Sequence, residues 1–227
     1  MEHQPRHELK YIISTADAPA LQERLERTLK RDIHGDQRNS YQIRSLYFDD
    51  AYNSAYWDKL DGVMHRDKYR IRMYGLSDDA IYLERKRKAG DLIIKDSQRV
   101  TRRLAQQLMD GEPRGLEKLE HPLFQEMFRE MRLRLLRPAV IVEYDRRAYT
   151  YPALKVRVTF DRDVRAGAGS LDLFAPRLPT VPAMEPGQLV LEVKYDFYLP
   201  DFIPPLLSSI PAQRSAVSKY TLCRRYT

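Results

Sequence analysis

Cysteine is nearly absent from this chain of 227 residues, since Cys223 is the only one. A single cysteine excludes an internal disulfide framework and fits a reducing cytoplasm. No apolar run approaches the ~18 residues that a membrane-spanning helix needs. The start, MEHQPRHELKY, has no apolar segment of the kind found in secretory signals. We therefore expect a cytoplasmic protein without a membrane span of its own.

Internal repeats and low-complexity tracts are also missing from the sequence. Hydrophobic residues make up 43% and charged residues 31% of the chain, which excludes the disordered and membrane classes. This length is enough to bury a substantial core. We expect one domain over residues 1–227.

Acidic residues are outnumbered by basic ones, and the formal net charge is +7. Such a balance favours anionic partners: nucleic acid, nucleotides, polyphosphate or an anionic membrane. Charge alone does not choose among them. The position of each lysine and arginine on the predicted strands is more informative.

Alternating apolar and polar residues dominate the chain and predict strands with short, turn-like connections. The strands are expected at 6–14, 42–49, 67–75, 80–88, 91–100, 139–149, 153–161 and 188–197. Helical patterns fall at 15–31, 54–62, 101–111, 117–134 (interrupted early by Pro122), 200–211 and 215–226. The predicted class is α+β, an antiparallel sheet of about eight strands with helices packed outside.

The stretch YRIRMYG (69–75) illustrates a feature that most of these strands share. Because side chains alternate along a strand, Arg70 and Arg72 point to one face while Ile71 and Met73 point to the other. The residues that share charged faces in this way are Glu8 with Lys10; Glu84 with Lys86 and Lys88; Lys95 with Ser97 and Arg99; Tyr144 with Arg146; Lys155 with Arg157, Thr159 and Asp161; and Glu192 with Lys194.

For any single strand, a solvated outer face explains such a pattern. Taken together, the strands favour another interpretation, because their opposite faces are apolar and suited to packing on helices. Helices outside the sheet would turn the charged faces inward. Eight strands are enough to close a barrel, so we expect an eight-stranded closed barrel with a wet, charged lumen.

Like charges in a lumen repel by several kcal/mol at ~4 Å, so an anion must compensate them. Phosphate chains suit this role, because arginine forks match phosphate oxygens and lysine supplies compact charge. The carboxylates Glu8, Glu84 and Glu192 either hold a divalent cation that bridges phosphate oxygens or merely pair with neighbouring lysines. Both interpretations stay open at this stage.

The order of short motifs along the chain resembles a known family. The first strand, with Arg6, Glu8, Lys10 and Tyr11, is similar to the ExExK strand of the CYTH or triphosphate tunnel metalloenzyme superfamily. The set as a whole resembles the VTC domain, the polyphosphate polymerase branch, and comprises SLYFDD (45–50), KYRIRMYG (68–75), YLERKRK (82–88), IIKDSQR (93–99), VEYDRRAY (142–149), VRVTFD (156–161), LEVKY (191–195) and SKYTLC (218–223).

The resemblance implies a tunnel that binds ATP and inorganic polyphosphate through basic residues, with Mn²⁺ or Mg²⁺ on an acidic residue. It implies phosphate contacts from Lys10, Arg70, Arg72, Lys86, Lys95, Arg146, Arg157, Lys194 and Lys219. It further implies a pocket tyrosine at Tyr144 and a metal-binding glutamate at Glu192. Arg70, Arg72, Lys86, Tyr144 and Arg146 would then act on the transferred phosphoryl group.

One departure from the family pattern bears on activity. Arg6 stands at the first glutamate position of ExExK, so the two-carboxylate metal site of the hydrolytic relatives is incomplete. This favours a polymerase that transfers the γ-phosphoryl of ATP to a growing polyphosphate chain. The alternatives are a tunnel triphosphatase and a non-catalytic polyphosphate or nucleotide binder. Nucleic-acid binding is the weakest option, because the sequence lacks an evident base-stacking platform.

Overall fold

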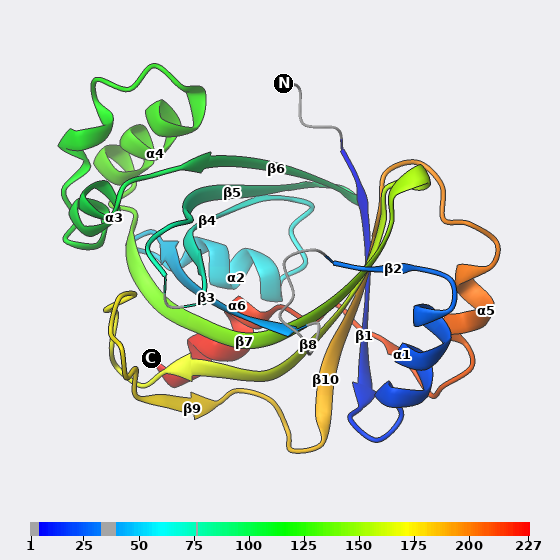
Figure 1. The fold of residues 1–227 in the computed structure, drawn as a ribbon. Coiled ribbons are helices and arrows are strands. Elements are labelled where there is room, and N and C mark those ends of the chain that lie inside the picture. Colours follow the sequence, from blue (N-terminus) through cyan, green and yellow to red (C-terminus); the bar gives the residue numbers. More distant parts are fainter. Residues whose placement is uncertain (1–4, 33–39, 76) are drawn as a thin grey trace.

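The computed structural model describes residues 5–32, 40–75 and 77–227. Its centre is an eleven-stranded antiparallel sheet that curves round on itself, with helices outside it (Figure 1). The strands are β1 (His7–Ser14), β2 (Lys30–Arg31), β3 (Ser40–Asp49), β4 (His65–Tyr74), β5 (Ile81–Ala89), β6 (Leu92–Arg99), β7 (Arg137–Tyr151), β8 (Val156–Gly167), β9 (Thr180–Pro182), β10 (Gln188–Tyr195) and β11 (Gln213–Arg214). The α+β class and all eight predicted strands are confirmed.

The helices are α1 (Ala18–Glu26), α2 (Ser54–Leu60), α3 (Arg102–Met109), α4 (Pro122–Leu133), α5 (Ile203–Leu207) and α6 (Lys219–Cys223). Each lies within a predicted helical segment. Pro122 does not interrupt α4 but begins it, because proline is tolerated where a helix has no use for the backbone N–H. No helix in the described part of the chain is long and apolar enough to span a membrane.

The expected closed barrel of eight strands is wrong. The sheet runs in the order β11-β1-β10-β8-β7-β3-β4-β5-β6, with β2 beside β7 and β9 beside β8. Its ends meet at a single bridge, where Arg6 and Ile93 exchange two backbone hydrogen bonds of 3.0 and 2.9 Å. Further along, the free edge of β1 pairs with β11 instead. Because β11 occupies that edge, β1 and β6 form no continuous ladder within the described residues.

The outward face of β4 and β5 is apolar and packs on α3 and α4. Ile71, Met73 and Leu83 are fully or almost fully buried there, in one cluster with Leu108 of α3 and Met127 of α4. This confirms the predicted outward direction of the apolar side chains. It also places Arg70 and Arg72, which alternate with them, on the inner face.

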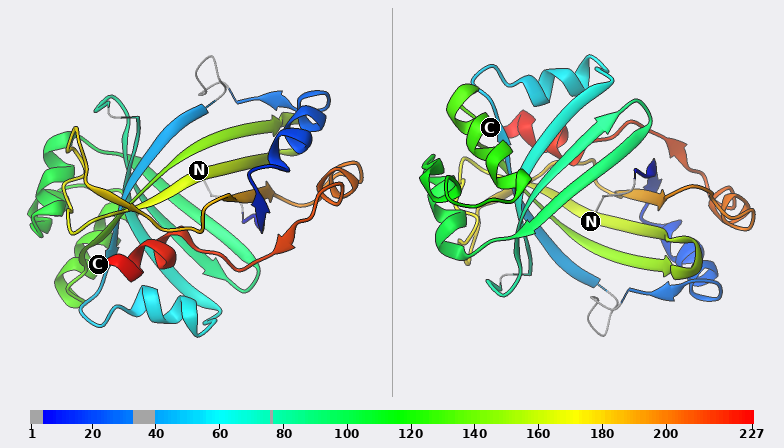
Figure 2. Two further views of the ribbon diagram at one scale, coloured as in Figure 1. Left: turned by 90° about the horizontal axis from the view of Figure 1, so that it is seen from below. Right: turned by 90° about the horizontal axis from the view of Figure 1, so that it is seen from above.

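A second layer of helices covers the other side of the curved sheet. Phe160 of β8 and Val193 of β10 are buried against Leu21 and Leu25 of α1 and Ile203 of α5. Figure 2 shows α3 and α4 on one side of the molecule, and α1 and α5 on the opposite side. Helices on both outer surfaces therefore leave the charged faces of the strands turned inward.

The last helix is placed differently from the others. Tyr220 and Cys223 of α6 pack with Tyr47, Val142 and Tyr144, which share the inward faces of β3 and β7. In both views of Figure 2, α6 lies beside α2. The helix thus carries Lys219 to the inside of the sheet.

Candidate functional site

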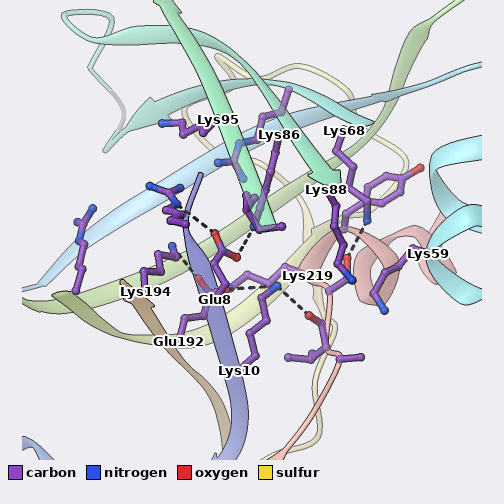
Figure 3. Close-up of a pocket in the computed structure, with 18 of the residues that line it drawn as sticks. Glu8, Lys10, Lys59, Lys68, Lys86, Lys88, Lys95, Glu192, Lys194 and Lys219 are labelled. Carbon is purple, nitrogen blue, oxygen red and sulfur yellow. Dashed lines mark hydrogen bonds and ion pairs between the residues drawn. The ribbon is translucent and has the colours of Figure 1, made fainter. Parts of the chain in front are cut away.

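A cavity of about 640 Å³ lies inside the curve of the sheet. Sixteen lysines and arginines line it, against the four carboxylates of Glu8, Asp91, Glu192 and Asp196. Figure 3 shows their side chains converging from several strands and from α2 and α6. A walled cavity with such an excess of one charge concentrates anions.

Most of the residues singled out in the sequence come together in this cavity. Those that line it are Glu8, Lys10, Arg70, Arg72, Lys86, Lys95, Tyr144, Arg146, Arg157, Glu192, Lys194 and Lys219. Glu84 is the exception: its side chain lies beneath the wall and is 1% exposed. The members of this set that lie on strands thus face the inside of the sheet, as strand alternation predicted.

Glu84 anchors three of the cavity cations. Arg70 Nε donates to Glu84 Oε2 at 2.7 Å, Arg72 Nη1 lies 3.7 Å from the same oxygen, and Lys95 Nζ contacts Oε1. Burial by itself would raise the pKa of Glu84, but Arg70 and Arg72 hold it well below its usual range. The carboxylate stays ionised and fixes both guanidinium groups toward the cavity.

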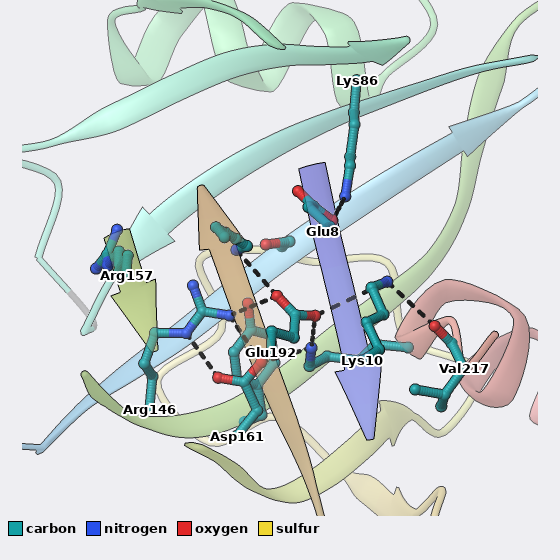
Figure 4. Close-up of polar contacts among 12 residues, drawn as sticks. Glu8, Lys10, Lys86, Arg146, Arg157, Asp161, Glu192 and Val217 are labelled. Atoms are coloured by element: carbon teal, nitrogen blue, oxygen red, sulfur yellow. Dashed lines mark hydrogen bonds and ion pairs between the residues drawn. The ribbon is translucent and has the colours of Figure 1, made fainter. Parts of the chain in front are cut away.

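Asp161 and Glu192 form the second anchor (Figure 4). Arg146 makes two parallel hydrogen bonds with Asp161, of 2.6 and 2.7 Å. Lys219 Nζ lies 2.5 Å from Asp161 Oδ2 and 2.7 Å from Glu192 Oε1, and Lys194 lies 2.9 Å from Glu192 Oε2. Asp161 and Glu192 raise the pKa of Lys219 although burial opposes them. Lys219 therefore remains charged inside the protein.

Glu8 pairs with Lys86 across the cavity. Lys86 Nζ donates to Glu8 Oε2 at 2.5 Å, and Arg6 Nε lies 3.7 Å from Glu8 Oε1. Burial lowers the pKa of Lys86 to about 8, although Glu8 favours its charged form. An added anion would raise this pKa again, so occupancy of the cavity is coupled to proton uptake.

Tyrosine hydroxyls complete the wall around the arginines. Arg70 Nη1 donates to the hydroxyl of Tyr47 at 2.7 Å, and Arg72 Nη2 donates to that of Tyr144 at 3.3 Å. Arg146 lies 5.2 Å from the ring centroid of Tyr144. Tyr144 thus positions two cations, one through its hydroxyl and one through its ring.

Arg157 stands apart from both anchors. Its Nη2 donates to Asp32 Oδ2 at 2.5 Å and to the hydroxyl of Tyr41 at 2.6 Å.

The three glutamates proposed as metal ligands do not gather. In the ranges that the structure describes, no group of three or more His, Cys, Asp or Glu side chains is placed to hold a metal ion. Glu84 does not line the cavity and is almost completely buried, so the part of the hypothesis that joined it to Glu8 and Glu192 is not supported. Glu8 and Glu192 do lie diagonally across the β1–β10 pair, where Lys10 faces Glu192 and Lys194 faces Glu8.

Glu8 and Glu192 suit a divalent cation that takes most of its ligands from water and substrate phosphates. Glu8 Oε1 is buried and accepts no hydrogen bond. Cations such as Mg²⁺ commonly use one or two carboxylates together with substrate phosphates and water. Glu8 and Glu192 are therefore the residues that would hold such an ion.

Several lining residues were missed in the sequence. Arg66 and Lys68 share the inward parity of Arg70 and Arg72, and Lys88 shares that of Lys86, so strand alternation contained the signal. Asp161 is fully buried behind the lining; it was placed on the charged face of Arg157 but was not proposed as a site residue. Lys59, on α2, had no such signal.

Comparison with known proteins gives one family match and several similar solved structures. A family model described as the VTC domain matches residues 5–227. None of the curated proteins matches the chain. The solved structure of a candidate adenylyl cyclase from Hippeastrum, described as having a dominant triphosphatase activity, aligns over 97% of this chain and 95% of its own, with a TM-score of 0.56 and 14% identity. A candidate adenylate cyclase from Bacillus halodurans aligns over 92% of this chain and 89% of its own, with a TM-score of 0.48 and 13% identity.

The family match covers almost the entire sequence and includes every motif quoted above. The Hippeastrum structure is similar in fold over nearly the same span. The chain belongs to the VTC domain family.

Proposed function

We propose that this protein is a polyphosphate polymerase, which transfers the γ-phosphoryl group of ATP to a growing inorganic polyphosphate chain. The supporting observation is the cavity in which sixteen cations face four carboxylates. Two of its arginines, Arg70 and Arg146, form ion pairs with the buried carboxylates of Glu84 and Asp161. Such fixed charges stabilise a transferring phosphoryl group without reorganising during the reaction.

The reaction needs little beyond positioning and charge. An oxygen of the terminal phosphate of the chain attacks the γ-phosphorus in line, a new P–O bond forms, and the bond to the β–γ bridging oxygen breaks to release ADP. The attacking phosphate is already ionised, so no general base is required. Arg70, Arg72 and Arg146 would bind the equatorial oxygens, since arginine forks match phosphate geometry.

A divalent cation, Mn²⁺ or Mg²⁺, would be held by Glu192 and Glu8. When bound, it would neutralise charge on the phosphate oxygens. Lys10, Lys86, Lys95, Lys194 and Lys219 would supply the remaining positive charge around the chain.

A tunnel triphosphatase is the second candidate function. The same cavity suits any inorganic or organic triphosphate, with water in place of the attacking phosphate. The Hippeastrum protein, which shares the fold, is described as having a dominant triphosphatase activity. The two reactions differ only in the acceptor of the phosphoryl group.

Incubation of the pure protein with ATP and Mn²⁺ or Mg²⁺ separates these functions. A polymerase produces long-chain polyphosphate, and the amount of ADP rises in proportion to the phosphate added to the chain. Orthophosphate without polymer would contradict the polymerase and support the triphosphatase. Tight binding without turnover under either metal would identify a non-catalytic binder.

One substitution tests whether turnover depends on the cavity. Lys10 Nζ donates to the backbone carbonyl of Val217 at 3.1 Å and lies 3.8 Å from Glu192. Lys10→Ala therefore removes a lining charge with little expected loss of structure. We expect turnover to fall by about tenfold or more. Lys118→Ala, at an exposed position outside the cavity, is the matched control and keeps full turnover.

A further inference from the structure

Two leucines at the end of α4 lie in solvent between arginines. The segment 132–137 reads RLRLLR, and five of its six residues are exposed. Leu133 is 74% exposed and Leu135 is 62% exposed. Arg132 and Arg137 are exposed as well, and neither forms an ion pair with a carboxylate in the described part of the chain. This segment therefore presents apolar side chains and uncompensated positive charge side by side.

Leu135 adopts a backbone conformation that costs leucine free energy. Its φ is 55°, in the left-handed region that side chains with a Cβ avoid. It directly follows Arg134, the C-cap of α4, where helices most often place glycine. Because the side chain of Leu135 is exposed, packing in the core does not offset this cost. Strained residues of this kind gather at functional sites, so Leu135 points to a binding role.

Aromatic side chains of the β3–α2 connection and of α2 lie beside this segment. Ala51 N donates to the backbone carbonyl of Arg134 at 3.4 Å, and the neighbouring Tyr52 is 84% exposed. Every residue of α2 is half-buried or exposed. Trp57, the only tryptophan in the chain, is 53% exposed there. In both views of Figure 2, α2 and α4 lie on the side of the molecule away from α1.

Two carboxylates beside these residues are already engaged, because Asp50 and Glu130 both pair with Arg134. Single exposed apolar side chains are ordinary, but a group of them rimmed by charge marks an interaction site. We call this group the leucine–arginine face, and it consists of Tyr52, Trp57, Arg132, Leu133, Leu135 and Arg137.

The composition of the leucine–arginine face selects the kind of partner. Nucleic acid supplies phosphates for arginine but no apolar phase for Leu133 and Leu135. A second copy of this chain on a two-fold axis would set arginines against the same arginines. An anionic bilayer offers lipid phosphates, an acyl boundary, and an interface at which tryptophan and tyrosine are enriched.

The shape of the face also suits a bilayer. Tyr52, Leu133 and Leu135 are 62–84% exposed, so their side chains stand out from the surface. A fluid bilayer closes around such side chains, whereas a protein partner needs a complementary surface. Arginine between leucines fits as well, because its stem can follow the apolar side chains while its charge stays at the headgroups.

We propose that the leucine–arginine face docks this protein on the surface of an anionic phospholipid membrane. Leu133 and Leu135 enter the boundary between headgroups and acyl chains, and Arg132 and Arg137 bind lipid phosphates. Tyr52 and Trp57 lie at the interface. The docking is separate from the proposed function, because these six residues are not among those that line the described cavity.

Trp57 reports the docking directly, since its emission is the only tryptophan signal of the intact protein. The protein is titrated with vesicles of phosphatidylcholine alone, or of phosphatidylcholine mixed with phosphatidylglycerol. The emission should shift to shorter wavelength with the mixed vesicles, because Trp57 leaves water for the interface. It should not shift with phosphatidylcholine alone, and added salt should weaken binding to the mixed vesicles.

Two variants separate the apolar and the charged contribution. Leu135→Asn removes apolar surface without a change of charge and should weaken binding by about fivefold or more. Its melting temperature should not fall, because asparagine tolerates the left-handed conformation at the end of a helix. Arg132→Gln/Arg137→Gln should weaken binding by about tenfold or more, since each basic residue at an anionic surface adds several-fold in affinity.

Each variant has a control on another part of the surface. Arg24→Gln/Lys30→Gln removes two exposed charges from α1 and β2. Phe197→Ser removes an aromatic side chain that is 79% exposed in the loop after β10. Both controls should keep the affinity for mixed vesicles within about twofold.

Three outcomes would overturn the docking. An unshifted Trp57 emission with the mixed vesicles would mean that this face touches no membrane. An equal loss of affinity in the control variants would mean that net charge alone draws the protein to lipid. A shift with poly-L-glutamate but none with vesicles would assign the face to an acidic protein partner. Turnover of ATP enters none of these measurements, so the docking and the proposed function fail or hold separately.

Discussion

At the scale of single residues, buried carboxylates are what make the cationic cavity stable. Asp161 is fully buried and uses both of its oxygens on Arg146 and Lys219. Burial would raise its pKa, but Arg146 and Lys219 hold it below the usual range. Asp161 thus positions the cations that would contact phosphate, without any need to contact the ligand itself.

Substitution of Asp161 should therefore damage the fold before it damages the chemistry. Asp161→Asn leaves two buried cations short of a counter-charge, and loss of one partner from a buried ion pair typically costs about 3–5 kcal/mol. The free energy of unfolding, from urea denaturation at neutral pH, measures this cost. Addition of polyphosphate should recover part of it, because the ligand supplies negative charge to the same cations.

The matched control is an exposed ion pair on α1. Glu23 lies 2.6 Å from Arg27, and both side chains are largely exposed. Glu23→Gln should change the free energy of unfolding by no more than about 0.5 kcal/mol. A comparable cost for both variants would mean that Asp161 is no special anchor.

At the scale of secondary structure elements, one carboxylate at the end of β3 joins two helices that contribute to the cavity. Asp49 accepts backbone hydrogen bonds from Ala55 at 2.9 Å and Tyr56 at 3.1 Å, in the first turn of α2. It also accepts the hydroxyl hydrogen bond of Tyr220 in α6. The positions of Lys59 on α2 and Lys219 on α6 therefore depend on the same residue.

Tyr220→Phe tests this link, because it keeps the ring and removes only the hydroxyl. A hydrogen bond to a charged group contributes about 1.5–3 kcal/mol, so we expect a loss of that size in the free energy of unfolding. Polyphosphate affinity should fall as well, since α6 carries Lys219. Tyr52→Phe, at a side chain that is 84% exposed, is the control and should have no measurable effect. An unchanged stability of Tyr220→Phe would show that packing alone holds α6.

At the scale of the whole molecule, stability and ligand binding are opposed through the lysines of the cavity. Burial lowers the pKa of Lys86 to about 8, and it lowers the pKa values of Lys68, Lys95 and Lys194. Their unfolded pKa values are near 10.4. Between these limits the unfolded chain binds more protons than the folded one, so the folded state gains stability as the pH rises.

The melting temperature of the ligand-free protein should therefore rise from about pH 7.5 to about pH 9.5. With polyphosphate bound, the lysines regain their charge, and this rise should weaken or reverse. Thermal unfolding monitored by circular dichroism, with and without polyphosphate, measures both trends. A melting temperature that falls over this range without ligand would contradict the lowered pKa values.

The predictions made from the sequence were most accurate where they rested on a local property of the backbone. Alternation along a strand follows from the geometry of each residue, so it identified the eight long strands, their apolar outer faces and most of the charged residues that line the cavity. It failed for β2, β9 and β11, because strands of two or three residues arise only where another edge is near. The expected closure of the barrel failed for the same reason, since β11 competes with β6 for the edge of β1.

Charged and apolar side chains on opposite faces of an antiparallel sheet could be predicted from the amino-acid sequence, and its ordered motifs identified the family. Which charges meet depends on how the strands and helices pack in the folded chain. Strand register sets Glu84 opposite Arg70, Lys86 opposite Lys68 and Asp161 opposite Arg146, and the packing of α6 brings Lys219 to Asp161. Register is a relation between segments far apart in the chain, and a single residue of slip would reverse every face. That is why the cations were predictable one strand at a time, whereas their division into paired and unpaired groups was not.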